Sequence, residues 1–488
     1  MQLCAELGRF AAMATSWFVI TLLVLLPACN DSNPGGDKNP PNIILITLES
    51  LRSDHVGSYG YTRDTTPALD ELAEQGTLFE NAYSVTSWTL PSHASLFTGL
   101  YPPAHQVESY KDRLDDSYTT LAEALADGGY ETAGFISGPF LLPSHNLDQG
   151  FQTYDISAAN LQDESAHDDI TNPTMERLLS QFLEKTRSRR PFFLFAYFWD
   201  PHYDYIPPSP FDTTFVPDHA QIIDVRAYET SNIVNRSISP GQLDYVISQY
   251  DGEILCTDEL LGRLWKRLRE LDLWENTVIV VTADHGEEFF EHGDKGHKNN
   301  LYEESIHVPL IIKQPGQSTS RRDLRLVSLV DVYPTLLELA GIETPVRHHG
   351  HSLLDPDPPS RSLFYALRSE WIVRRSDVPE NLRTWLETDL KDPNFAVMTD
   401  QWFAIRDGRH KLVVTRNADT RNLFDIVADP GEKNPLSTDL NRFTALKDLL
   451  SIQRKVFEDD RGLWKQSGKA DLTPEQEQHL RSIGYIGR

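Results

Sequence analysis

The sequence of 488 residues predicts an α/β protein, with a doubly wound and mostly parallel sheet followed by a small antiparallel sheet. Three observations predict this fold class. Apolar runs of strand length alternate with helical periodicity between residues 42 and 345. Several of these runs end directly in polar residues, as strands do where a parallel sheet carries its site. After residue 345, short strand-like pieces joined by turns replace the alternation.

The first residues are expected to be a targeting segment. Residues 10–26 are almost wholly apolar, follow Arg9 and end in Leu26-Pro27-Ala28-Cys29, which resembles the cleavage box of bacterial lipoproteins. A simple transmembrane anchor is the alternative, although the run is slightly short for a span. We expect a signal peptide over residues 1–28, a flexible tether over 29–41, and an exported protein that is lipid-anchored at the bacterial cell envelope, in the periplasm or on the outer surface.

The charge balance limits the partners. The chain has 45 Lys and Arg against 72 Asp and Glu, a formal net charge of −27, which argues against binding to nucleic acid or to anionic membranes. The lipid on Cys29 is then the only expected membrane contact. An anionic substrate needs a locally positive site, for instance a metal ion. Because Cys4 would be removed and Cys29 lipidated, Cys256 is the only remaining thiol, and the mature chain forms no internal disulfide.

Strands and helices alternate along the predicted catalytic domain, residues 42–345. The strands are expected to be buried and parallel because they are continuously apolar and rich in β-branched residues. Helices are indicated by apolar residues at helical spacing and by stop signals such as Gly76 and Gly341. We expect strands over residues 42–48, 132–137, 192–198, 277–282 and 308–312, and helices over 66–76, 119–127, 242–271 and within 326–341.

A C-terminal subdomain is expected over residues 346–488. Its strand-like pieces are short and are joined by turns such as Asp407-Gly408, which favours an antiparallel sheet. A last helix is expected over residues 473–483. The strand-like pieces cover residues 363–367, 403–407, 410–415 and 421–425.

The stretch 87–99 places hydroxyl groups beside a predicted helix start. Thr89 and Ser92 flank Pro91, and the helix is expected to stop at Gly99. Free N–H groups and the positive end of the helix dipole would stabilise an oxyanion beside these hydroxyls. Taken alone, the stretch also fits an ordinary capped surface helix.

Three segments deliver polar side chains to one edge of the predicted sheet. Glu49 follows the first strand, Asp284 and His285 follow the strand over residues 277–282, and Thr89 with Ser92 comes from the stretch just described. Carboxylates, a hydroxyl and an imidazole are a ligand set for one divalent cation, with room left for a substrate. A polar loop without a metal is the alternative for Asp284 and His285.

Ordered motifs accompany this set. They are residues 42–61, Thr89-Leu90-Pro91-Ser92 with residues 95–102, Asp200-Pro201-His202, residues 282–286, 296–304 and 308–310, and the late segments 423–426 and 429–432. Over residues 42–487 the chain resembles the sulfatase family within the alkaline phosphatase superfamily. The resemblance implies an alkaline phosphatase-like fold and a metal-dependent hydrolase.

The departures from this family concern the nucleophile and the metal. Sulfatases have a Cys or Ser, oxidised to formylglycine, at the Thr89 position and an Arg at the His93 position. Their calcium is bound by oxygen ligands only, whereas the imidazole of His285 favours Zn²⁺ or Mn²⁺ over Ca²⁺. Glu49, Thr89 and Asp284 with His285 resemble instead the threonine-nucleophile branch, which includes phosphoethanolamine transferases and lipoteichoic acid synthases.

The resemblance implies a role for each candidate residue. Thr89 would be the nucleophile, and one metal ion is expected, with a second ion on Asp200, His202 or His297 left open. The expected metal ligands are Glu49, Thr89, Asp284 and His285; the general-acid candidates are His202 and His297; the expected substrate contacts are Ser92, His93 and Lys298.

The predicted function is that of a metal-dependent hydrolase or transferase that acts on a phosphate or sulfate ester, with a phosphate ester favoured. The ester would belong to a small molecule, a glycan or a lipid. One alternative is a sulfate-ester hydrolase that works without formylglycine. A second is a non-catalytic binding protein on the same scaffold. The sequence leaves the identity of the leaving alcohol and the oligomeric state open.

Overall fold

The computed structural model describes residues 40–159, 171–186, 190–202, 204–226, 228, 233–235, 237–374, 386–387, 395–415, 420–436 and 440–482. Residues 40–488 form one compact unit. The predicted signal peptide and nearly all of the tether lie outside the described residues, so the lipid anchor and the envelope location stay predictions. Within the described residues, no helix has the length and apolar character needed to span a membrane.

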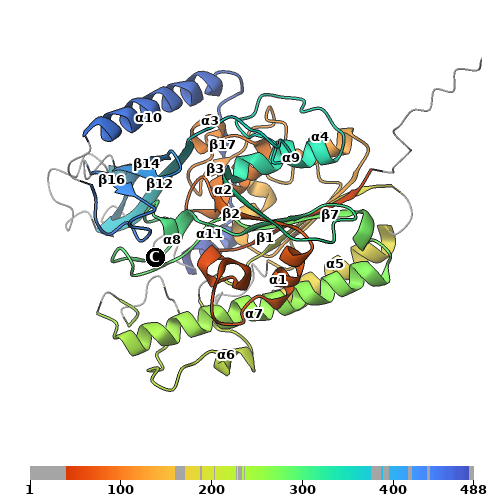
Figure 1. Ribbon diagram of the computed structural model, residues 1–488, viewed down its shortest axis with the longest axis horizontal. Helices are drawn as coiled ribbons and strands as arrows, with labels where there is room; N and C mark the ends of the chain where they lie inside the picture. The colour runs from red at the N-terminus through yellow and green to blue at the C-terminus, as the bar shows by residue number, and fades with distance from the viewer. Residues whose placement is uncertain are drawn as a thin grey trace, which may run out of the picture. The chain divides into compact units, whose positions relative to one another are not determined.

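An eight-stranded sheet forms the centre of the fold (Figure 1), in the order β11-β2-β10-β7-β1-β6-β4-β5. Every neighbouring pair is parallel except those of β10, which runs antiparallel to β7 and β2. The predicted α/β class with a mostly parallel sheet is confirmed. The strands are β1 (Asn42–Leu48), β2 (Thr77–Tyr83), β4 (Glu131–Ile136), β5 (Thr153–Asp155), β6 (Phe192–Phe198), β7 (Thr277–Ala283), β10 (Leu310–Lys313) and β11 (Arg321–Ser328).

Helices cover both faces of this sheet (Figure 1). One layer holds α1 (Pro67–Glu74), α5 (Asn172–Thr186) and the long α7 (Pro240–Glu270), and the other holds α2 (Thr89–Thr98), α4 (Leu121–Asp127) and α9 (Val332–Leu339). Capping boxes start α4, at Thr120, and α7, at Ser239, and satisfy N–H groups that have no partner inside the helix. Shorter elements are α3 (Pro102–His105), β3 (Asp112–Arg113), α6 (Phe211–Thr214), β8 (Glu288–Phe289), β9 (Lys295–Gly296) and α8 (Glu303–Ile306).

The predicted antiparallel sheet near the C-terminus is confirmed. Its strands have the order β12-β14-β15-β16, and β13 pairs with β14. Helix α10 contacts β14 and β15 of the antiparallel sheet and also contacts α3. Strand β17 pairs with β3. The C-terminal elements therefore pack against the antiparallel sheet and against segments between the strands of the large sheet. The elements are β12 (Leu363–Arg374), β13 (Leu386–Glu387), β14 (Phe395–Arg406), β15 (His410–Thr415), β16 (Arg421–Asp425), α10 (Leu440–Arg461), β17 (Gly468–Lys469) and α11 (Pro474–Ser482).

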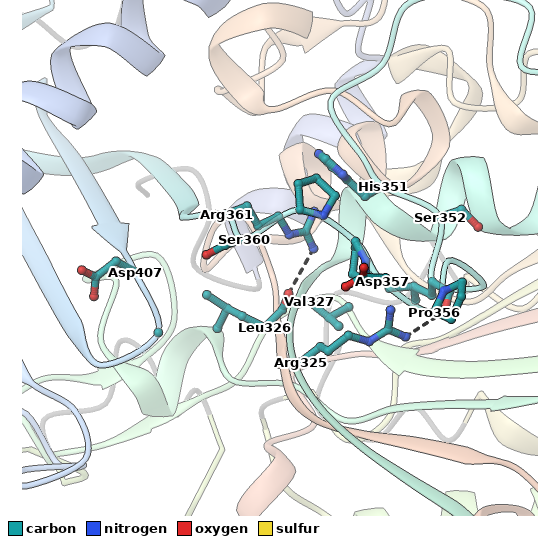
Figure 2. Close-up of a pocket in the computed structure, with 14 residues that line it drawn as sticks. Arg325, Leu326, Val327, His351, Ser352, Pro356, Asp357, Ser360, Arg361 and Asp407 are labelled. Carbon is teal, nitrogen blue, oxygen red and sulfur yellow. Dashed lines mark hydrogen bonds between the residues drawn. The ribbon is translucent and has the colours of Figure 1, made fainter.

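The connection between the two sheets runs along β11 and encloses a cavity of about 380 Å³ (Figure 2). Arg325 and Arg361 line this cavity, but both guanidinium groups already have partners. Arg325 binds Asp323 and the carbonyl oxygens of Leu353 and Asp355, while Arg361 binds Asp331. The arginines therefore fix the connection to the sheet.

Replacing Arg361 with alanine is expected to lower the free energy of unfolding by about 3 kcal/mol, as breaking a buried ion pair does. Asp331 is fully buried, and its only charged partner in the described residues is Arg361. The matched control is Arg263→Ala, because Arg263 pairs with Glu176 on the exposed surface and its loss should cost less than about 1 kcal/mol. Denaturant unfolding measures both variants, and equal losses would contradict the prediction.

Candidate active site

The candidate site begins where β1 and β7 end. These strands are parallel neighbours, with Leu48 opposite Ala283, so the residues that follow them leave the sheet side by side. Ser50 adopts a positive φ of 55° and donates its N–H to Asp284 Oδ1 at 3.1 Å. This turn holds the segment after β1 against the segment after β7.

Four residues predicted to bind metal converge there. The Thr89 hydroxyl donates to Glu49 Oε1 at 3.0 Å and lies 3.3 Å from His285 Nε2. His285 Nε2 is 3.1 Å from Glu49 Oε1 and 3.6 Å from Asp284 Oδ2. Each of the four side chains is at most 1% exposed. The sequence-predicted ligand set is therefore one cluster, with the hydroxyl of Thr89 inside it.

The donor atoms of this cluster fit a divalent cation. The ring nitrogen Nδ1 of His285 lies 2.8 Å from the carbonyl oxygen of Gly286, which can only accept, so Nδ1 carries a hydrogen. In neutral His285 the lone pair is then on Nε2, which faces the carboxylates. Asp284 Oδ2 is buried and has no hydrogen-bond partner among the residues that the structure describes. A buried carboxylate oxygen in that state calls for a positive partner.

The pKa shifts of the three ionisable side chains also indicate a site for a cation. Burial raises the pKa of Asp284 well above its usual value, and the nearby charge of Glu49 raises it further. Burial would also raise the pKa of Glu49, but the adjacent His285 outweighs it and lowers this pKa to about 2. For His285, burial acts to lower the pKa, while Asp284 and Glu49 raise it to about 9. The protein alone thus favours positive charge at the point where the three side chains meet.

A third histidine joins the cluster. Ligand atoms of Glu49, His285 and His297 all lie within 4.8 Å of one another. His297 Nδ1 is 3.3 Å from Glu287 Oε1, and the hydroxyl of Tyr205 donates to Glu287 Oε2 at 2.9 Å. Glu287, which the sequence analysis does not single out, therefore orients the ring of His297.

The surroundings of His297 favour its neutral form, and its predicted role as general acid stays a prediction. Burial lowers the pKa of His297 well below its usual value, and the nearby positive charges of His285, His202 and Lys298 lower it further. A neutral ring that donates from Nδ1 to Glu287 has its lone pair on Nε2. That state suits a metal ligand or a proton acceptor, and not a proton donor.

His202 remains the candidate proton donor. It follows β6, and its ring stacks on Trp199 with a centroid distance of 3.7 Å. The ring meets that of His297 edge-on, with 5.2 Å between centroids. His202 is therefore brought to the same edge of the sheet as the predicted ligands.

Two of the predicted substrate contacts lie beside the cluster and are bound to protein groups. Ser92 donates to the main-chain oxygen of Asp284 at 2.7 Å. His93 donates from Nδ1 to the carbonyl oxygen of Thr89 and accepts at Nε2 from the hydroxyl of Thr47, both at 2.9 Å. Burial lowers the pKa of His93 to about 4, so its ring is neutral. Both side chains hold α2 against the sheet, and their predicted contact with substrate stays a prediction.

The helix start also differs from the expected one. α2 begins at Thr89 itself, Trp88 is its N-cap residue without a side-chain cap, and Pro91 lies inside the first turn. Proline has no N–H, so the first turn offers one donor fewer to an anion than was expected. The third predicted substrate contact, Lys298, is half-buried, and its Nζ lies 5.8 Å from the centroid of the Trp88 ring.

Tyr197 is a further member that the sequence analysis does not identify. Its hydroxyl donates to Glu49 Oε2 from the end of β6, where Tyr197 lies opposite Thr47 of β1. This contact fixes the second oxygen of Glu49 and leaves Oε1 to face Thr89 and His285.

Comparison with known proteins agrees with the fold. A family model described as Sulfatase matches residues 41–342. Arylsulfatase K of Canis lupus familiaris is 26% identical over 448 residues, which cover 83% of this chain and 80% of that protein. Iduronate 2-sulfatase of Homo sapiens is 26% identical over 410 residues, which cover 67% and 74%. The crystal structure of the phosphonate monoester hydrolase of Agrobacterium radiobacter superposes with a TM-score of 0.66 at 22% identity and covers 86% of this chain and 96% of its own.

Proposed function

The chain belongs to the sulfatase family of ester-hydrolysing enzymes, and from this we propose that it is a metal-dependent hydrolase or transferase of phosphate esters, with Thr89 as its nucleophile. One observation carries the proposal: the hydroxyl of Thr89 lies inside the cluster formed by Glu49, Asp284 and His285. The ester belongs to a small molecule, a glycan or a lipid.

The residues of the chain divide the reaction between them. Glu49, Asp284, His285 and the oxygen of Thr89 would hold a divalent cation, and its positive charge would lower the pKa of the hydroxyl and offset the negative charge of the ester. The Thr89 oxygen loses its proton and bonds to phosphorus, while the bond from phosphorus to the leaving oxygen breaks. His202 is placed to protonate that leaving oxygen. Water or an acceptor hydroxyl then breaks the bond between phosphorus and Thr89, which restores the hydroxyl.

The donor set favours a transition metal. One imidazole nitrogen among oxygen ligands suits Zn²⁺ or Mn²⁺ better than Ca²⁺, which takes oxygen ligands in larger number. Because ligand atoms of His297 group with those of Glu49 and His285, His297 would be a further ligand of the same ion. We therefore propose one ion per chain.

A sulfate ester is the second candidate substrate. The names of the two curated relatives, arylsulfatase K and iduronate 2-sulfatase, favour it. Against it stands the threonine at position 89, which cannot supply the aldehyde hydrate on which the sulfatase mechanism depends. We propose that the chemistry of the nucleophile decides between the two esters.

Mass spectrometry of the covalent intermediate tests the proposal. The protein is mixed with an aryl phosphodiester or, separately, with an aryl sulfate, quenched in acid within a turnover and digested. We expect on Thr89 a phosphoryl group that keeps the second ester substituent of the diester, and none on Ser92, which lies in the same peptide. An adduct formed only with the sulfate would favour the second candidate, and turnover without any adduct on Thr89 would contradict both.

A further inference from the structure

We infer that Glu432, in the late segment 429–432, is a positioning residue that holds the loop carrying His297 and Lys298. This role rests on the proposed function and extends it. It assigns a task to segment 429–432, which has no contact with a proposed metal ligand among the described residues. We call residues 286–304 the site loop. It runs from the end of β7 to the first residues of α8.

The inner side of the site loop is tied to the nucleophile segment. Lys298 donates its N–H to the main-chain oxygen of Ser87 at 2.9 Å, and the hydroxyl of Ser87 donates to the carbonyl oxygen of Asn300 at 2.6 Å. Ser87 lies two residues before Thr89. The position of His297 relative to Thr89 therefore depends on how firmly the loop is held against this segment.

The outer side of the loop is held by Glu432 at two points. Glu432 Oε2 accepts from the N–H of Glu303 at 2.7 Å, at the first residue of α8. The main-chain oxygen of Glu432 accepts from His292 Nε2 at 3.3 Å, and His292 Nδ1 donates to Glu304 Oε1 at 2.6 Å. The two points of contact bracket residues 293–302, and His297 and Lys298 lie between them.

The antiparallel sheet supplies the charge that makes a buried Glu432 tolerable. Lys411 of β15 is fully buried and lies 3.1 Å from both Glu432 and Glu303. Arg406 of β14 donates to Glu303 Oε2 at 2.8 Å. Two cations thus balance two carboxylates, and removal of one charge alone would leave its partner uncompensated in the interior. A fair test must remove Glu432 and Lys411 together.

Two charge-matched double variants separate the hydrogen bond from the charge. Glu432→Leu with Lys411→Met removes the acceptor for the N–H of Glu303, while Glu432→Gln with Lys411→Met keeps an amide oxygen there. We expect the Leu/Met pair to lower kcat/KM by about a hundredfold, the size of effect that a displacement of about 1 Å has on a catalytic group. The Gln/Met pair should recover most of this loss. The substrate is whichever of the two aryl esters the parent protein turns over.

The effect must pass through His297. We expect the hundredfold loss to shrink to less than about threefold when the Leu/Met pair is introduced into His297→Ala, because coupled residues give non-additive effects. Full additivity, or parent-like turnover by the Leu/Met pair, would overturn the inference. Arg409→Ala, in an exposed pair with Asp425 of the same sheet, is the control and should leave kcat/KM unchanged.

Tryptic cleavage of the folded protein measures how firmly the site loop is held, and it needs no assay of turnover. The site loop contains Lys295 and Lys298, and we expect faster cleavage there in the Leu/Met pair but not in the Gln/Met pair. If the Leu/Met pair yields no folded protein, Glu432→Asp, which draws the carboxylate back by one methylene, takes its place. Parent-like cleavage of every variant would overturn the inference. A phosphoryl group still found on Thr89 in these variants would leave the proposed function intact.

Discussion

Replacement of Thr89 with alanine is expected to lower kcat/KM by about 10⁴-fold or more. The change removes the oxygen that forms the bond to phosphorus, and the loss of a nucleophile leaves only the contribution of binding and electrostatics. Thr89→Ser keeps the hydroxyl and should lower kcat/KM by no more than about tenfold. The loss is smaller because only the methyl group, which restricts the rotation of the side chain, is removed. Steady-state kinetics with the two aryl esters measure both variants.

Thr98→Ala is the matched control for this prediction. Thr98 is also a buried threonine of α2, and its hydroxyl donates to the carbonyl oxygen of Ala94 at the far end of the helix. Its loss should leave kcat/KM unchanged. If Thr89→Ala kept more than a tenth of the parent activity, a covalent threonine intermediate would be excluded. Absence of turnover in the parent protein with both aryl esters would instead support the alternative of a non-catalytic binding protein on this scaffold.

Asp284→Asn is expected to weaken metal binding by at least about a hundredfold, more than the loss of a residue that only orients a ligand. The buried Oδ2 of Asp284 has no hydrogen-bond partner in the described part of the chain, so its charge is available to a cation. Metal content after dialysis should fall from about one Zn²⁺ or Mn²⁺ per chain to almost none, and activity should fall with it. When the parent protein is stripped of its metal, added calcium should not take the place of that metal.

The stability of the metal-free protein distinguishes this effect from misfolding. Burial and the charge of Glu49 raise the pKa of Asp284, so the neutral amide relieves repulsion between two carboxylates. The metal-free variant should therefore unfold at the same temperature as the metal-free parent, or at a higher one. Asp323→Asn changes a buried carboxylate on β11, away from Thr89, and should leave metal content unchanged. Parent-like metal binding by Asp284→Asn would contradict the assignment.

The sequence predicts the centre of the sheet well because β1, β6 and β7 are apolar on both faces. β2 and β11 are not predicted. Glu80 and Asn81 interrupt the apolar pattern of β2, and β11 begins with Arg321 and Arg322. β11 is the edge strand, where charged side chains meet solvent and its pairing with β2 depends on residues far away in the chain. Local pattern cannot identify such a strand.

Helix α10 is missed for a different reason. Of its 22 residues, only Leu446, Leu450, Phe457 and Asp460 are buried, so its apolar stripe is narrow. Leu440 and Ile452 are exposed and blur the helical periodicity. The stripe contacts β14, β15 and α3, which come from three parts of the chain. Tertiary packing, and not an intrinsic pattern, defines this helix.

The residues of the candidate site that directly follow a strand can be predicted from the sequence. Glu49, Asp284 and His285 each follow an apolar run, and polar residues at that point are an unusual signal. Tyr197 sits inside an apolar run and reads as core until the register places it opposite Thr47. Glu287 stands beside a second glutamate, and only the loop geometry selects it. For Ser92 and His93, one residue of error in the helix start corresponds to a rotation of about 100°, which is enough to change the groups that a side chain meets.

The burial of α2 has a consequence for the order of events in the life of the protein. All ten residues of α2, Thr89 included, are buried. Once the chain has folded, no modifying enzyme can reach position 89, so a nucleophile made by oxidation would have to be installed on the nascent or unfolded polypeptide. A threonine removes that requirement. Under the proposed function, the nucleophile is therefore complete as soon as the chain has folded, and no maturation step has to come before folding.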